Sequence, residues 1–332
     1  ELRHSIDRDP AMGAAHAFLG TALRDRGDLA GAQVSLQRAI ALLPTSAAVF
    51  VDLGITYLRT GKLDEGIGQL EAGLNLQVPS PPEPDWTGAI STLRQALVKA
   101  PDRPEAHNVL GLMLGRTGAA STSVAAQFRD AIRLRPEYAE AHNNLGLVLV
   151  QAGEDEAGVA ALREATRISP DYADAHANLG AALTATDAAE AVRELEKAVS
   201  LAPGSVKAQF NLALAYGAAS GGTAKEIEQL RKVVALAPTF ARAHLALGKA
   251  LLQESKVPEA IDALSEAVKL EPGRGESHYQ LGLALTRAGR KDDAAAALRK
   301  GRELVAADDR MQNANLDVAE GRAAFENGDL DQ

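Results

Sequence analysis

The sequence predicts an all-α fold, a solenoid of stacked antiparallel helix pairs, and three observations support this prediction. The pair Leu-Gly, in one unit Leu-Ala, recurs every 33–35 residues with a single gap of 57. A proline closes each unit at the same spacing, and its single gap of 22 falls inside the irregular leucine gap. The hydrophobic share is 46% although aromatics are only 4%, because alanine is abundant, and alanine favours helices.

The unit closed by Pro170 shows why each repeat is a pair of helices. Leu145 falls on one helical stripe and Leu162 on another, and Gly153 opens the short turn between them. Pro170 ends the second helix because its ring and missing N–H cannot continue the hydrogen-bond ladder. One hairpin cannot bury its apolar face alone, so the pairs must stack, and we expect one elongated array rather than two globular domains.

This pattern resembles the tetratricopeptide repeat (TPR) over nearly the whole chain. The family has a bulky residue at position four, Leu-Gly at seven and eight, and large or small residues at fixed later positions, with proline at thirty-two. In the unit from Ala139 these places hold His142, Leu145, Gly146, Leu149, Gly158, Leu162, Ala165 and Pro170. The resemblance implies a right-handed superhelix whose inner surface binds proteins.

The repeat register predicts the organisation of the chain in order. Residues 1–10 are expected to form the second helix of a half repeat, and residues 11–79 two full repeats. Residues 80–101 form a proline-rich loop and another half repeat, followed by six repeats over residues 102–306. Residues 307–332 are predicted to be a half repeat or a C-terminal capping helix.

Trp86 stands where the register is broken. It follows a segment with four prolines, which favour an extended strand-like strut over a helix. The interpretation that we favour is that Trp86 fills the gap left by a missing first helix. The alternative is a ligand anchor, since tryptophan is enriched at interface hot spots.

The two chain ends carry complementary halves of a repeat. One explanation is that the sequence is cut from a longer array. The other is head-to-tail self-assembly, in which the C-terminal half docks on the N-terminal half of the next copy, a contact that does not close and builds a filament. The residues expected at such a contact are Leu2, Ser5, Ile6, Gly321, Phe325 and Leu330.

Composition excludes several function classes. The net charge of −9 and the absence of a basic run argue against a nucleic-acid partner. No apolar stretch approaches the ~18 residues of a membrane span. The absence of cysteine excludes disulfides and thiolate chemistry, and is compatible with a cytoplasmic or a secreted or periplasmic location.

No catalytic residue, cofactor or metal site is predicted. Walker, GxGxxG, GxSxG and HExxH motifs are missing, so nothing supplies a nucleophile or an acid–base pair. Six of the seven histidines share one repeat position on different helices, too far apart to ligate one zinc ion. We interpret them as packing residues.

The inner surface is the predicted binding site. The family lines it with first-helix positions two, five, six, nine, twelve and thirteen. Asparagines at position six resemble the ladder in the TPR superhelix of O-linked N-acetylglucosamine transferases, and position five becomes apolar along the chain. Lys207 and Arg242 at position two oppose the helix dipole, which indicates contacts with a partner's acids. The candidate residues are Asn108, Asn143, Asn144, Asn178, Asn211, Lys207, Phe210, Arg242, Leu245 and Tyr279.

The sequence therefore predicts a non-enzymatic scaffold that binds a protein or an extended peptide in its groove. The first alternative is the head-to-tail filament described above. The second is that these repeats are the regulatory region of a larger enzyme.

Overall fold

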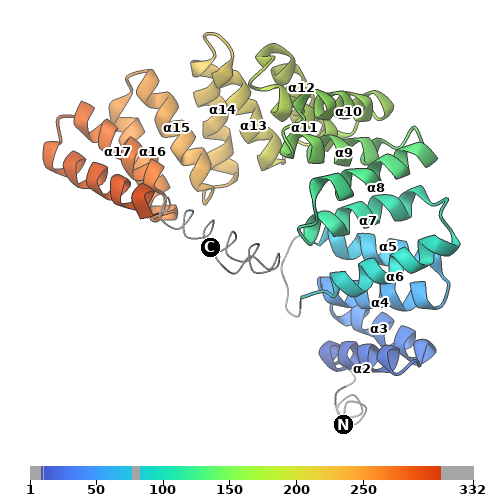
Figure 1. Ribbon diagram of the computed structural model, residues 1–332. Helices are drawn as coiled ribbons and strands as arrows, with labels where there is room; N and C mark the ends of the chain where they lie inside the picture. Colours follow the sequence, from blue (N-terminus) through green and yellow to red (C-terminus); the bar gives the residue numbers. More distant parts are fainter. Residues whose placement is uncertain (1–8, 10, 77–82, 308–332) are drawn as a thin grey trace, which may run out of the picture. The chain divides into compact units, whose positions relative to one another are not determined.

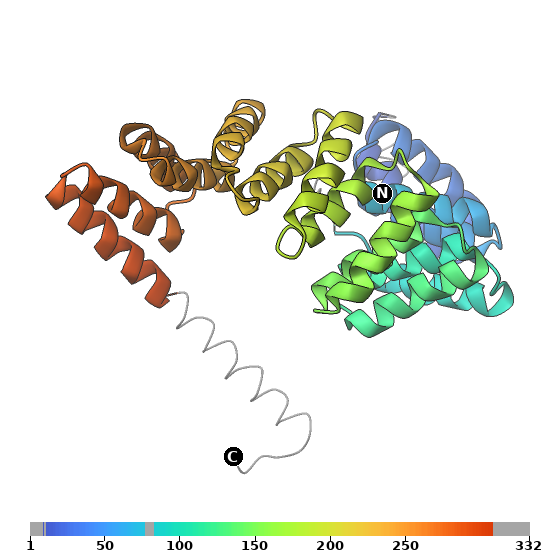
Figure 2. The same ribbon diagram turned by 90° about the horizontal axis from the view of Figure 1, so that it is seen from above.

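The computed structural model describes residues 9, 11–76 and 83–307. These residues contain α-helices and turns and no strand, which confirms the predicted all-α fold. The first and second helices of each pair lie side by side and antiparallel (Figures 1 and 2). The chain divides into two compact units, residues 1–170 and 171–332. The repeat pattern predicts a single array and gives no indication of this division, because Pro170 has the same repeat position as the other closing prolines.

Unit 1, which ends at Pro170, contains helix pairs and one single helix. Its first helices are α2 (Gly13–Asp25), α4 (Ala47–Arg59), α7 (Pro104–Arg116) and α9 (Ala139–Gln151). Their second helices are α3 (Leu29–Leu42), α5 (Leu63–Asn75), α8 (Ser121–Leu134) and α10 (Asp155–Ile168). The single helix is α6 (Trp86–Lys99), which packs against α4 and α7.

Unit 2 continues with pairs of the same kind. Its first helices are α11 (Ala173–Leu183), α13 (Val206–Ala218), α15 (Ala241–Gln253) and α17 (Gly275–Arg287). Their second helices are α12 (Ala188–Leu201), α14 (Thr223–Leu236), α16 (Val257–Leu270) and a helix over residues 291–307. Each second helix from α12 to α16 also packs against the first helix of the next pair, which is the stacking expected of a solenoid.

Small residues set the distance between the two helices of a pair. A Cβ added at Gly146 would lie 2.6 Å from Leu162 Cγ and 2.9 Å from the Gly158 carbonyl oxygen. A Cβ at Gly158 would lie 2.9 Å from the Gly146 carbonyl oxygen. The helices are therefore in backbone contact at this crossing. Gly153, in the turn that follows α9, has φ of 81°, a conformation that a side chain disfavours.

The core of unit 1 runs without interruption past the single helix. One cluster of buried side chains extends from Val51 in α4 through α6 to Leu149 in α9. Trp86 belongs to this cluster and is 8% exposed, and the Arg116 guanidinium lies 5.2 Å from its ring centroid. Trp86 is thus a packing residue, as the favoured interpretation predicts, and not an exposed ligand anchor.

The repeated histidine has a structural role that its position predicts only in part. At His107, His142, His244 and His278, Nε2 lies 2.9–3.1 Å from the carbonyl oxygen of the proline six residues earlier. A carbonyl oxygen only accepts, so Nε2 carries the hydrogen and donates it. In the one unit with glutamine instead, Gln209 Nε2 donates to the Pro203 carbonyl oxygen at 2.9 Å. In these five repeats the side chain ties the first helix to the turn before it.

We expect a His142→Gln variant to keep the stability of the wild type, because glutamine makes the same bond in another repeat of the chain. A His142→Leu variant should have a free energy of unfolding lower by about 1 kcal/mol, which is the net contribution of one hydrogen bond. Urea unfolding of the two variants checks this. If the glutamine variant loses as much as the leucine variant, the ring itself and not the hydrogen bond stabilises the turn.

Candidate functional site

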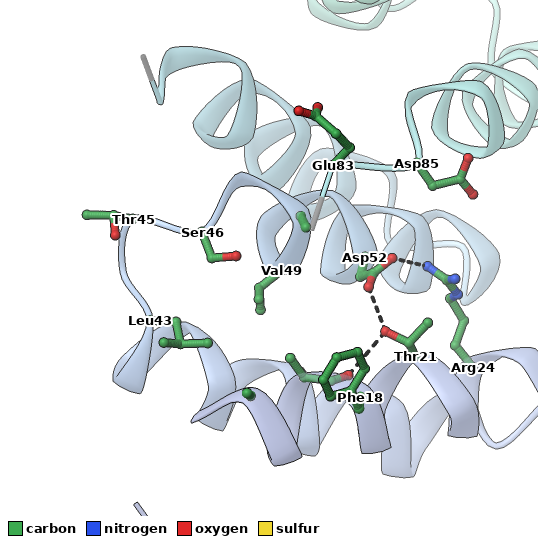
Figure 3. A pocket seen from close by; sticks show the side chains of 13 residues that line it. Phe18, Thr21, Arg24, Leu43, Thr45, Ser46, Val49, Asp52, Glu83 and Asp85 are labelled. Atoms are coloured by element: carbon green, nitrogen blue, oxygen red, sulfur yellow. Dashed lines mark hydrogen bonds and ion pairs between the residues drawn. The ribbon is translucent and has the colours of Figure 1, made fainter. Parts of the chain in front are cut away.

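A pocket of about 420 Å³ opens between the first helices of the two N-terminal repeats (Figure 3). Small side chains line the space, with Ala14 and Ala17 from α2 and Ala48 from α4. Phe18, on the α2 side, is 59% exposed, and Val49 on the α4 side is buried. The pocket is thus an apolar hollow with one large exposed aromatic side chain at its edge.

A buried ion pair forms the polar end of the pocket. The Asp52 carboxylate on α4 binds the Arg24 guanidinium on α2 and accepts a hydrogen bond of 2.6 Å from the Thr21 hydroxyl. The Arg24 side chain is 7% exposed and the Asp52 side chain 17%. Burial by itself would lower the pKa of Arg24, but the charges and hydrogen bonds of Asp52 and Asp25 together outweigh burial and hold this pKa above its ordinary value. The pair fixes α2 against α4.

Two further carboxylates reach the pocket from the segment before α6. Glu83 and Asp85 are exposed residues of its lining, and Figure 3 labels both beside Asp52 and Arg24. Asp85 also caps α6 by accepting a hydrogen bond of 2.8 Å from the Gly88 N–H. The broken register therefore brings acidic groups to a surface formed by the first two repeats.

Sequence reasoning did not single out this pocket. The one available signal was the series of small residues at first-helix positions two and five, Ala14, Ala17 and Ala48, beside the large Phe18. The position of Glu83 and Asp85 at this site follows from the packing of α6 against α4, which the repeat pattern does not specify.

The predicted asparagines of unit 1 contact one another. Asn144 Nδ2 donates to Asn108 Oδ1 at 3.0 Å, and Asn143 Nδ2 donates to Asn144 Oδ1 at 3.3 Å. Asn108 and Asn143 are buried, 3% and 4% exposed, whereas Asn144 is half-buried. These amides bond across the interface between α7 and α9, so Asn108 and Asn143 lie inside the repeat stack and not on an open surface.

The predicted residues of α11 and α13 lie close together. Lys207 Nζ donates to Asn178 Oδ1 at 2.7 Å, and Asn178 is 5% exposed. Asn211 and Phe210 are half-buried, and Lys207 is exposed. Asn178 thus holds the lysine in place from within the fold.

The predicted apolar strip of unit 2 is interrupted at its centre. Leu245 is 5% exposed and belongs to the core, against which Phe210 packs. Tyr279 is 46% exposed and borders a second pocket, about 460 Å³, together with Val305.

An aromatic pair connects α13 to Arg242. The rings of Phe210 and Phe240 meet edge to face with centroids 5.0 Å apart, and the Arg242 guanidinium lies 5.7 Å from the Phe240 centroid. Leu214, which is not among the residues predicted from the sequence, is 38% exposed on α13. Phe240 therefore links the half-buried Phe210 of one repeat to the exposed Arg242 of the next.

The residues expected at a head-to-tail contact, a metal site and a membrane span complete the comparison with the sequence. Leu2, Ser5, Ile6, Gly321, Phe325 and Leu330 lie outside the described residues. Among the described residues, no group of three or more His, Asp or Glu side chains is arranged to hold a metal ion. In the same part of the chain, no helix has the length and apolar character needed to cross a membrane.

Family models decide the assignment. A tetratricopeptide repeat model matches residues 19–75, 218–274 and 245–309, and a second TPR model matches residues 148–186. The chain belongs to the tetratricopeptide repeat family. This assignment supports the coarse function of a protein-interaction scaffold, because stacked TPR hairpins present an extended binding surface. No curated protein matches the sequence.

Several solved structures are similar to the chain, and one of them, with a TM-score above 0.5, has the same fold. The chain aligns with the APC/C hetero-tetramer Cut9-Hcn1 at 13% identity and a TM-score of 0.56, over 91% of this chain and 55% of that one. MamA from Desulfovibrio magneticus RS-1 aligns at 26% identity and a TM-score of 0.47, over 51% of this chain and 96% of that one. YrrB, described as a TPR protein with an unusual peptide-binding site, aligns at 20% identity and a TM-score of 0.46, over 54% of this chain and 93% of that one.

Proposed function

We propose that this TPR chain is a non-enzymatic scaffold that holds an extended segment of a partner protein along the first helices of unit 2. The segment carries acidic and apolar side chains. Its proposed contacts are Lys207, Phe210, Asn211, Leu214, Arg242 and Tyr279. One observation carries the proposal, namely that two exposed cations beside apolar surface have no acidic partner within the described residues.

The placement of the two cations is unfavourable for the helices themselves. Lys207 and Arg242 are the second residues of α13 and α15, and neither helix has an acid in its first turn. A cation there opposes the partial positive charge of the helix N-terminus. Lys249, by contrast, pairs with Glu276 at 3.0 Å. Unpaired cations at two helix N-termini suit a ligand carboxylate, which would also accept hydrogen bonds from the helix N–H groups.

Exposed apolar side chains beside the cations supply the second part of the proposed contact. Leu214 is 38% exposed, and Phe210 presents part of its ring on the same helix. Burying the exposed part of such side chains against a partner contributes a fraction of the about 1.5–3 kcal/mol that complete burial of a large apolar side chain gives. The Asn211 amide, half-buried on α13, can both donate to and accept from the backbone of an extended peptide.

Charge reversal tests the proposal. We expect the double variant Lys207→Glu and Arg242→Glu to bind acidic-apolar peptides at least about tenfold more weakly, because both contacts become repulsive. The probe is an array of short peptides in which Leu or Phe alternates with Asp, Lys or Ser. The measurement is the Kd of array-selected peptides for the full chain by fluorescence polarisation.

The matched control reverses two exposed cations on the second helix α12, Arg193→Glu and Lys197→Glu, which changes the net charge by the same amount. The control should bind as the wild type does. Equal weakening in both double variants would indicate a non-specific charge effect and contradict the proposed site. Selection of lysine-containing peptides by this surface would contradict the proposed partner chemistry.

The two alternatives from the sequence have no specific support. All six residues expected at a head-to-tail contact lie outside the described residues, and no feature of the described helices favours a regulatory role over a scaffold.

A further inference from the structure

We infer that unit 1 has a binding site of opposite chemistry, which takes an apolar side chain flanked by lysine or arginine from a partner protein. The site is the pocket between α2 and α4 with the segment that carries Glu83 and Asp85. This inference rests on the proposed scaffold function, but the site contains none of the residues proposed to bind in unit 2. The partner segment is recognised by charge and shape together.

The size and lining of the pocket specify an apolar anchor. Its volume of about 420 Å³ falls within the range, about 300–1,000 Å³, of pockets that enclose a ligand. Alanines form the walls, Val49 is buried behind them, and Phe18 stands exposed at the edge. An exposed phenylalanine beside an apolar hollow gains most from a side chain that covers its ring and fills the hollow.

The charges around the pocket specify a cation beside that anchor. Arg24 binds both Asp52 and Asp25, so this cluster of three charges has a net charge of −1. Glu83 and Asp85 have no ion pair within the described residues and increase the local charge to −3. Arg24 is buried and its charge is balanced by two carboxylates, so it does not repel a ligand cation at the rim. A lysine or arginine next to the apolar anchor would be attracted there.

The contribution of Glu83 and Asp85 depends on the interrupted repeat. They precede α6, the single helix, and Asp85 is fixed by its cap on Gly88. The irregular segment therefore adds charge to a hollow whose walls come from two regular repeats. The Asp85 carboxylate is placed by its cap on α6.

The test uses two fluorescein-labelled peptides and the full chain. One peptide has phenylalanine between two lysines, and the other has glutamates in place of the lysines. We expect the lysine peptide to bind the wild type, and to lose about fivefold or more in affinity with Ala14→Leu, which fills the hollow from an exposed position. Glu83→Lys should weaken the lysine peptide by a similar factor, and increasingly so at low salt.

Control variants separate this site from the others. Glu71→Lys, an exposed charge reversal on α5 outside the pocket, should leave binding unchanged. The unit 2 reversal of Lys207 and Arg242 should also leave it unchanged, so failure of one site does not imply failure of the other. Circular dichroism verifies that each variant is folded.

Three outcomes would overturn the inference. These are no binding of the lysine peptide, equal binding of the glutamate peptide, and full affinity for the lysine peptide in the folded Ala14→Leu variant.

Discussion

An Arg24→Met variant is expected to lose about 2–4 kcal/mol of stability in the N-terminal repeats, because it leaves a largely buried carboxylate without its cation. Asp52 would retain only the hydrogen bond from the Thr21 hydroxyl. The partial exposure of the Asp52 side chain, 17%, places the expected loss below that of a fully enclosed pair. Amide hydrogen exchange in α2 and α4 is the appropriate measurement, since a repeat array need not unfold in one transition.

The double variant Arg24→Met with Asp52→Leu supplies the control for this effect. Replacing both charges with apolar side chains of similar size removes the unpaired carboxylate. Most of the protection of α2 and α4 against amide hydrogen exchange should therefore return. If the double variant is no more stable than the single one, the ion pair is not what fixes α2 against α4. The same pair borders the unit 1 pocket, so its loss would also widen the range of ligands that enter.

The second large effect concerns two glycines that differ only in their surroundings. Gly158→Ala should lower the free energy of unfolding by about 1–3 kcal/mol, because the new Cβ overlaps the Val150 methyl group and the Gly146 carbonyl oxygen. Gly68→Ala should instead add about 0.5–1 kcal/mol, because Gly68 is exposed within α5 and a Cβ there meets nothing within 4 Å.

Urea unfolding of the two variants measures this pair directly, with each serving as the control for the other. Helix propensity alone predicts a gain for both, so a stabilised Gly158→Ala variant would show that α9 and α10 can move apart at little cost. A destabilised Gly68→Ala variant would show that this face of α5 contacts something else.

The periodicity of the sequence predicted the fold, because each repeat places the same residue types at the same positions of a helix pair. Leu162 and Ala165, chosen from the stripe of one unit, are both fully buried, and Gly146 and Gly158 are in close contact as their missing side chains predict. Pro170 shows the limit of the pattern. It matches the other closing prolines, yet the chain divides there into two compact units.

The candidate site was less predictable, because a repeat position does not specify what faces it. Leu245 and Tyr279 share position five, but Leu245 is buried against a neighbouring helix and Tyr279 is exposed. The repeat position predicts a peptide contact for Asn178 but gives no sign of the hydrogen bond that Asn178 accepts from Lys207. Exposure depends on contacts between repeats, which the sequence of one repeat does not contain.

The sequence by itself determined the helix pairs, their spacing and their close approach, because these depend on residues within about 34 positions of each other. Only the tertiary structure decided which polar side chains bind one another and where a pocket opens. Arg24 and Asp52 belong to different repeats, and Glu83 lies in the segment after α5, so their meeting depends on how the pairs stack and not on any local pattern.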